Sequence, residues 1–533
     1  MPVLPLINRI WKRYADTINS RIISKDKWFS PSRTWYSFLI IVSLVGFIII
    51  WQLFFVRKSD LNSDIGLNSA SGVHDQALFS YGLYYWGLFP AYPLRSVLPE
   101  EFQSDDLFYS REGADRIMEE YGSSLRMESR HTILYGELGK NYLPYFHALI
   151  QGSPKNVSFK PANAAFFILS LVLLLVVFWR MGKGIMGIIL CLILGSYPFQ
   201  IFEVYYNENV FGYYISMAIL MTGLFLPFIF KKSLKLWIAL VSCATAGIIF
   251  AALFTIRTEP LMVSGAVFLI LLLHSERPFL QRAGLLVLLI LVFLAGEFVF
   301  SSYFESKFRE AAGIVAEKGG EVFKGRRAEH HVFWHSLWIG LGDFDDKYGI
   351  LWADSYGLAY AKPILIQKYG KKVLKDLDHT SLYENPIFTH PDYGPIIRDK
   401  FIKGITHDPG WYLGILMKRI LRIVKDSKNS RIWLFGWSVP TVIPGVFSFF
   451  VFIMLLFLKR WEYVKLMFFP LTTALVPLLV YSEGGMTSYF IGHLYLFSIA
   501  LYVLLKTGVE PLRYLGKKIA IGIRTVAANK PVI

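Results

Sequence analysis

Long apolar runs alternate with polar segments along this chain of 533 residues, and the alternation predicts its architecture. About 20 consecutive apolar residues form a helix long enough to cross a bilayer. Such runs predict about ten transmembrane helices, although the third and sixth are short enough to tilt or to merge with a neighbour. The runs lie at 36–56, 164–179, 185–200, 211–230, 236–255, 260–274, 283–301, 438–458, 466–481 and 490–505. We therefore expect an all-α polytopic membrane protein.

Two long polar segments, 57–163 and 302–435, separate the apolar runs and contain shorter amphipathic stretches. With an even number of spans both segments lie on one side of the membrane. We expect each to be a large loop that contains amphipathic helices. The chain then divides into a tail at 1–35, a transmembrane module with the first loop at 36–301, the second loop at 302–435, transmembrane helices at 436–505 and a tail at 506–533.

The positions of lysine and arginine indicate which side is cytoplasmic. These residues fill both tails and the short loops at 180–183, 231–235, 277–282 and 459–465. By the positive-inside rule this side is cytoplasmic, and both long loops are exported. The first apolar run begins late and has full span length, so we expect it to remain as an anchor rather than to be cleaved.

Composition narrows the class of protein further. With 54% hydrophobic and 18% charged residues, the chain is not an ordinary soluble enzyme. We attribute its net charge of +16 to topology and lipid contact, so membrane lipids are expected partners and nucleic acid is not. Cys191 and Cys243 lie within predicted spans, and neither is expected to be a disulfide partner or a metal ligand.

Acidic residues gather on the predicted exported side. Asp75 follows the first span, and Glu203 and Glu208 lie after the third. Glu259 and Glu483 lie in two further junctions on the same side. Carboxylates at a membrane boundary are costly without partners, so the set favours a shared polar site. Each junction taken alone is typical of ordinary loop-end polarity.

The order of these features resembles the GT-C superfamily of polytopic membrane glycosyltransferases, which includes protein O-mannosyltransferases, lipid A aminoarabinose transferases and mycobacterial arabinosyltransferases. Members have a cytoplasmic N-terminus, a long first exported loop with an early acidic residue, and a second large exported segment. His74-Asp75 matches the early acidic motif in place, but departs from the Asp-Glu pair of many members. The stretch 135–147 resembles the later part of that loop, with its Lys, Pro and aromatic residues. The resemblance covers the architecture of 36–300 and depends on order and position.

The resemblance implies an enzyme of the bacterial inner membrane whose active site faces the periplasm or the cell exterior. It would move a sugar from a polyprenyl-phosphate donor to a glycan, lipid or protein acceptor, with no cofactor required. Such a transfer needs a base near the acceptor, for which Asp75 is the candidate. Asp75 is equally well interpreted as the N-cap of an amphipathic helix that begins at Gln76. Glu208, or alternatively Glu203, would be its acidic companion, unless both are polar caps at the membrane interface.

The leaving phosphate needs cations, and arginine suits phosphate oxygens. Arg257 at an exported membrane edge is the best candidate, with Arg95 and Lys140 of the first loop as weaker ones. The alternative for Arg257 is a snorkelling anchor paired with Glu259.

The second loop carries a separate set of candidates. His331 and His335 would share one helical face at a spacing that metal ligands use. A run of Asp343, Asp345 and Asp346 could hold a divalent cation but lacks the calcium-loop pattern. The Trp and Tyr residues between 333 and 360 could instead stack on sugar rings or lie along the headgroups, and we favour an amphipathic helix that covers the mouth of the site. Farther along, His407-Asp408-Pro-Gly-Trp411 is typical of a helix and turn boundary. Four basic residues at helical spacing then suggest a surface helix that meets anionic headgroups or lipid-linked substrate, namely Lys418, Arg419, Arg422 and Lys425.

Other classes of membrane protein compete with this interpretation. An O-antigen polymerase or ligase uses the same lipid-linked sugars, but its catalytic basic residues usually lie in one large late loop. A transporter would place charges within its spans, where Glu297 is the main candidate, and would show a repeat that we do not find. A non-catalytic scaffold is the remaining alternative.

Overall fold

The computed structural model describes secondary structure that is almost entirely helical. Its strands form two small antiparallel sheets, in which β1 (Tyr92–Pro93) pairs with β2 (Leu125–Arg126) and β3 (Arg431–Leu434) pairs with β4 (Trp437–Pro440). The described residues are 42–50, 80–127, 139, 142–158, 160–180, 184–196, 235–256, 276–322, 333–371, 387, 390–429, 431–434, 437–461, 463–464, 467, 478–480 and 486–507.

Three of the described helices are long and apolar enough to cross a membrane: α8 (Lys160–Arg180), α12 (Leu236–Phe254) and α14 (Phe279–Glu317). They coincide with the predicted runs at 164–179, 236–255 and 283–301. Shorter apolar helices include α9 (Gly184–Ser196), α19 (Val442–Phe457) and part of α22 (Met486–Thr507). These features are those of a helical, membrane-embedded protein.

The remaining predicted runs are described in part or not at all. Residues 42–50 of the first run are helical. The runs at 211–230 and 260–274 lie outside the described residues, as does most of the run at 466–481.

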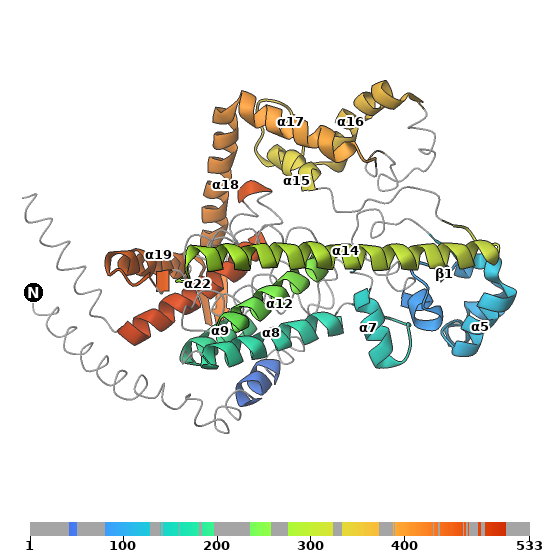
Figure 1. Cartoon of the computed structure of the whole chain (residues 1–533), viewed down its shortest axis with the longest axis horizontal. Coiled ribbons are helices and arrows are strands. Elements are labelled where there is room, and N and C mark those ends of the chain that lie inside the picture. The colour runs from blue at the N-terminus through green and yellow to red at the C-terminus, as the bar shows by residue number, and fades with distance from the viewer. Residues whose placement is uncertain are drawn as a thin grey trace, which may run out of the picture.

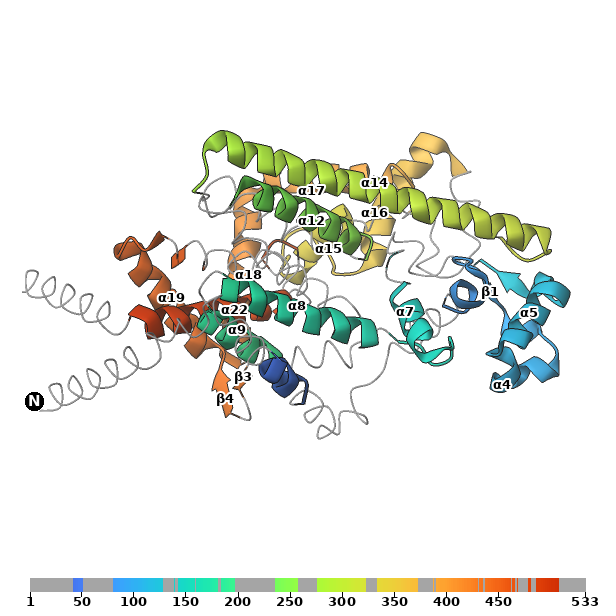
Figure 2. The ribbon, with the colours of Figure 1, turned by 60° about the horizontal axis from the view of Figure 1, so that its bottom comes forward.

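Helix α14 continues well beyond the predicted span, because the change in polarity at 302 ends the apolar stretch without ending the helix. Two ion pairs at helical spacing support the polar part, Lys307 with Glu310 at 2.9 Å and Arg309 with Glu305 at 3.0 Å. The same part buries Ala311 completely. In Figures 1 and 2 this end of α14 lies beside β1 and α5 (Arg111–Glu120).

Residues 80–127, which belong to the first long loop, form a small first unit on the end of α14. Residues 80–86 are helical, and the core of the unit combines aromatic and aliphatic side chains, among them Tyr81, Phe102, Phe108 and Ile117. Backbone hydrogen bonds of 2.9 Å from Met127 to Glu321 and from Glu321 to Leu125 join the unit to the residues after α14. The first loop and the beginning of the second therefore share one structure.

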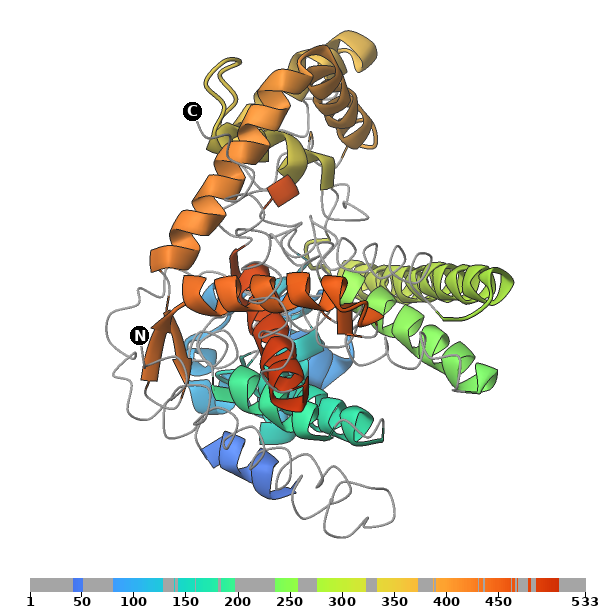
Figure 3. The ribbon, with the colours of Figure 1, turned by 90° about the vertical axis from the view of Figure 1, so that its left-hand side faces the viewer.

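A second unit comprises α15 (Phe333–Gly340), α16 (Asp354–Tyr369), α17 (Tyr393–His407) and α18 (Pro409–Asn429). Helices α15, α16 and α17 pack together, and α18 extends from α17 toward α19. In Figure 1, α18 runs upright whereas α14 lies horizontally, so the two helices point in clearly different directions. Figure 3 shows α18 on the left and α14 on the right.

Candidate functional site

The predicted site residues divide sharply between the described and the remaining parts of the chain. Arg95 and His335 are described. Six others lie outside the described residues: Asp75, Glu203, Glu208, Arg257, Lys140 and His331. Their proposed roles stay predictions.

Arg95 makes several contacts within the first unit. Its guanidinium pairs with Asp105 at 2.7 Å, donates to the carbonyls of Phe102 and Gln103, and lies over the ring of Phe108. Hydrogen bonds from Arg95 and then from Lys155 hold the pKa of the Asp105 carboxyl below its ordinary value. Contact between Arg95 and a donor phosphate would require some of these bonds to break.

His335 is buried at the meeting point of three helices. Its Nδ1 lies 2.6 Å from Tyr393 Oη on α17, and its Nε2 lies 3.0 Å from Asp354 Oδ1 on α16. The close approach requires Gly357, where a Cβ would lie 2.5 Å from Nδ1. Both ring nitrogens therefore face protein groups, and His335 joins α15 to its neighbours.

Within the described part of the chain, no group of three His, Cys, Asp or Glu residues has a geometry that could hold a metal ion.

The three aspartates at 343–346 point to different partners instead of converging. Asp343 lies 3.8 Å from Arg419, and Asp346 pairs with Lys418 at 2.6 Å. Asp345 accepts hydrogen bonds from the backbone N–H groups of the turn that follows it and from Trp411 Nε1 at 2.9 Å. Burial tends to raise the pKa of Asp345, but these hydrogen bonds outweigh it and hold the pKa below its ordinary value. The three aspartates therefore connect the turn at 345–350 to α18.

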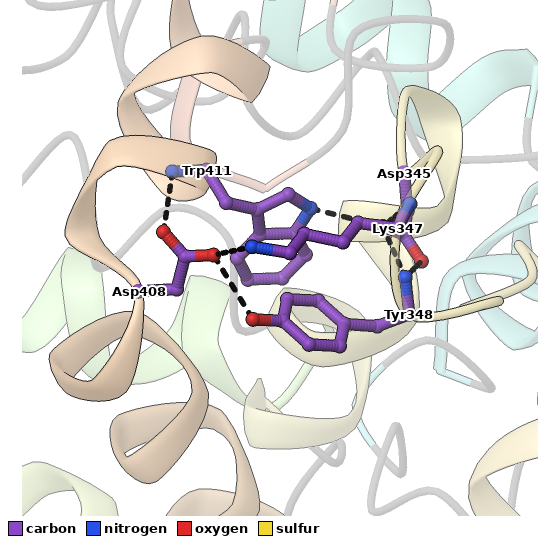
Figure 4. A network of polar contacts seen from close by, with 5 residues as sticks. All are labelled: Asp345, Lys347, Tyr348, Asp408 and Trp411. Carbon is purple, nitrogen blue, oxygen red and sulfur yellow. Dashed lines mark hydrogen bonds and ion pairs between the residues drawn. The ribbon is translucent and has the colours of Figure 1, made fainter.

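Asp408 begins α18 and joins it to the same turn (Figure 4). Its Oδ1 accepts the backbone N–H of Trp411 at 3.0 Å, and its Oδ2 accepts from Tyr348 Oη at 2.9 Å and from Lys347 Nζ. These bonds, with Lys347 the largest contributor, lower the pKa of Asp408 to about 2. An N-cap aspartate followed by proline at the first helical position is a recognised helix start, so the predicted boundary is confirmed.

Arg419 corrects the prediction of a wholly exposed basic face on α18. Its side chain is completely buried. Nη1 donates to the Leu478 carbonyl at 2.9 Å, and Nη2 donates to the carbonyls of Gly340 at 2.5 Å and Val480 at 3.0 Å. Helical spacing alone groups Arg419 with its exposed basic neighbours. Its burial depends on backbone carbonyls far away in the sequence, which helical spacing does not reveal. Arg419 thus connects α18 to α15 and to the segment 478–480.

A close backbone contact brings the first loop to the end of α12. The Gly139 N–H donates to the Thr255 carbonyl at 3.1 Å. A Cβ at 139 would lie 2.1 Å from Thr255 Oγ1, so the contact requires glycine. In the sequence, Gly139 immediately precedes Lys140, and Thr255 lies two residues before Arg257. Sequence reasoning had singled out both cations but had not predicted that their neighbours meet.

Comparison of the chain with protein-family models, with curated proteins and with solved structures found no match in any of the three.

Proposed function

We propose that this protein is a GT-C-like glycosyltransferase with about ten transmembrane helices. In this proposal it lies in a bacterial inner membrane and takes a sugar from a polyprenyl-phosphate donor on the periplasmic side. The acceptor is a glycan, a lipid or a protein. The contact between Gly139 and Thr255 is the observation that carries the proposal.

This contact lies close in the sequence to two predicted phosphate-binding cations. Loss of a lipid phosphate develops negative charge on its oxygens, which cations in a water-poor site stabilise. Lys140 and Arg257 were each predicted as phosphate contacts, although they lie far apart in the chain. The hydrogen bond joins Gly139, one residue before Lys140, to Thr255, two residues before Arg257. It supports a common role for the two segments.

The proposed reaction needs one proton acceptor and one leaving group. Asp75 takes the proton of the acceptor hydroxyl as its oxygen bonds to the anomeric carbon. The bond from that carbon to the phosphate oxygen breaks, and its electron pair leaves with the polyprenyl phosphate. Glu208, or Glu203 in its place, stabilises the positive charge that develops on the sugar. No cofactor is required by this scheme.

The first test replaces the proposed base. Asp75→Asn and wild-type protein are purified, reconstituted and assayed with radiolabelled polyprenyl-phosphate sugars. Loss of a general base lowers the rate by roughly a hundredfold or more. Asp106→Asn is the matched control, since Asp106 is an exposed carboxylate of the same loop and its replacement leaves transfer unchanged. Equal turnover in Asp75→Asn and wild type would remove Asp75 from the mechanism.

A second test addresses the contact itself. Gly139→Ala forces a methyl group against Thr255 Oγ1, and a displacement of about 1 Å near a reacting group lowers transfer by roughly a hundredfold. Gly139→Ala combined with Thr255→Ala removes the clashing hydroxyl and restores most of the activity. Gly313→Ala is the control, because a Cβ there meets open space. Unchanged transfer in the Gly139→Ala protein would contradict the proposal.

An O-antigen polymerase or ligase is the second candidate, favoured by the basic residues that α18 concentrates late in the chain. It predicts that polymerised or lipid A-linked glycan forms from a polyprenyl-diphosphate donor. No transfer from any monophosphate donor, together with transfer from the diphosphate, would establish this alternative.

A further inference from the structure

Helix α18 has an exposed apolar stripe opposite a buried face. The buried face carries Ile415, Arg419 and Ile423. The stripe follows helical spacing along three turns and consists of Leu413 (59% exposed), Met417 (56%), Ile420 (40%), Leu421 (64%) and Val424 (55%). Large apolar side chains that share one face mark a contact surface, whereas single exposed ones are normal.

A cationic flank lies between these two faces. At about 100° per residue, Lys418, Arg422 and Lys425 fall on one side of the stripe. Lys418 also pairs with Asp346, and Arg422 lies 3.7 Å from Asp426. Both basic side chains still keep part of their surface exposed. An apolar stripe with a basic flank is the arrangement of helices that lie in a lipid interface.

The direction of α18 agrees with such a position. Helix α14 contains a candidate span, and α18 runs upright in Figure 1 whereas α14 lies horizontally. Helix α18 also contacts α19, an apolar helix with exposed side chains of its own at Ile443, Val446 and Phe450. Helix α18 therefore contacts a helix of a predicted span that also exposes apolar side chains.

We propose that α18 lies in the plane of the membrane interface, with its apolar stripe among the acyl chains and its cationic flank on anionic phospholipid headgroups. Arg419 acts as a positioning residue, because its bonds to three backbone carbonyls fix the rotation of α18 and so the direction of the stripe. This proposal concerns docking of the second unit, and it holds whether or not the protein transfers sugars.

The test measures which solvent the stripe contacts. Cys191 and Cys243 are both replaced by Ala, and single cysteines are introduced as Leu421→Cys on the stripe and Thr406→Cys on α17, an exposed control. Each is labelled with an environment-sensitive fluorophore and reconstituted in vesicles of equal parts phosphatidylcholine and phosphatidylglycerol. The same labelling is repeated in the chain that keeps its native cysteines, since both are buried.

Nitroxide-labelled phospholipid should quench the Leu421→Cys probe several-fold more strongly than the Thr406→Cys probe, and iodide should show the reverse order. Equal quenching of both probes by iodide would place the stripe in water and overturn the proposal. Quenching of Leu421→Cys by neither agent would also overturn it, because a protein surface or a second copy would then cover the stripe.

The charged part has its own control. Arg422→Glu combined with Lys425→Glu should remove any preference of the Leu421→Cys probe for phosphatidylglycerol over pure phosphatidylcholine. Arg398→Glu on α17, an exposed arginine away from the flank, should leave the preference intact. A preference that survives reversal of the flank would overturn the role of anionic headgroups.

Discussion

The first and the second unit are held together by different kinds of interaction. The first unit, 80–127 with the end of α14, packs aromatic rings around Tyr81 and places its ion pairs on the surface. The second unit has an apolar core too, but its turn and its α18 are fastened by charged groups at Asp345, Asp408 and Arg419. Apolar packing tolerates salt and acid, whereas bonds to carboxylates depend on their ionisation. The units should therefore fail under different conditions.

Removal of Arg419 should have the largest effect. Arg419→Met removes the buried cation that pairs with Asp343 and donates to three carbonyls, which costs about 3 to 5 kcal/mol in the stability of the second unit. Hydrogen exchange should rise across 333–426 and stay unchanged across 80–127. Arg398→Met, an exposed arginine, serves as the control. Exchange that rises equally in both units would mean that they unfold together.

A cavity in the first unit should destabilise that unit and leave the second unit unchanged. Phe108 is 1% exposed and its ring lies 4.9 Å from that of Tyr81, measured between centroids. Phe108→Ala should lower the stability of the first unit by about 3 kcal/mol, because the lost packing leaves a void. Val97→Ala is an exposed control. Limited proteolysis should cut within 80–127 and spare the second unit, and cleavage of both would contradict the distinction.

Acid should loosen the second unit before the first. The folded-state pKa of Asp408 is about 2, below the ordinary value, so its stabilisation is present at neutral pH and is lost as the pH falls from about 4 toward 2. Asp345 and Asp346 shift in the same direction. Exchange of amides in the first turn of α18 should rise over this range. Asp408→Asn retains an N-cap but should show a smaller dependence on pH.

The smallest effect is expected from a surface ion pair. Arg116 and Glu101 of the first unit lie 2.8 Å apart, and 32% and 46% of their respective side-chain surfaces reach solvent. Arg116→Gln should leave the thermal unfolding temperature of the protein unchanged, because solvent screens such pairs. A clear drop in the unfolding temperature would show that ion pairs stabilise the first unit as well. The two units would then differ only in how much charged groups contribute to their stability.

Local chemistry explains which predictions the structure confirmed. The helices α8, α12 and α14 follow from apolar length, and the start of α18 follows from Asp408 before Pro409. The metal interpretation depended on spacing alone. Spacing does not tell where His335 directs its ring, and both of its nitrogens meet groups from other helices. The predicted acids lie outside the described residues, so their roles stay predictions.

The sequence by itself determined the membrane class and the positions of its main apolar helices, because burial in lipid depends on how many consecutive residues are apolar. Tertiary structure decided which polar residues meet. It extended α14 into the first unit, buried Arg419 among distant carbonyls and joined Gly139 to Thr255. These contacts form between segments far apart in the chain. Their energy depends on three-dimensional geometry, which no local pattern encodes.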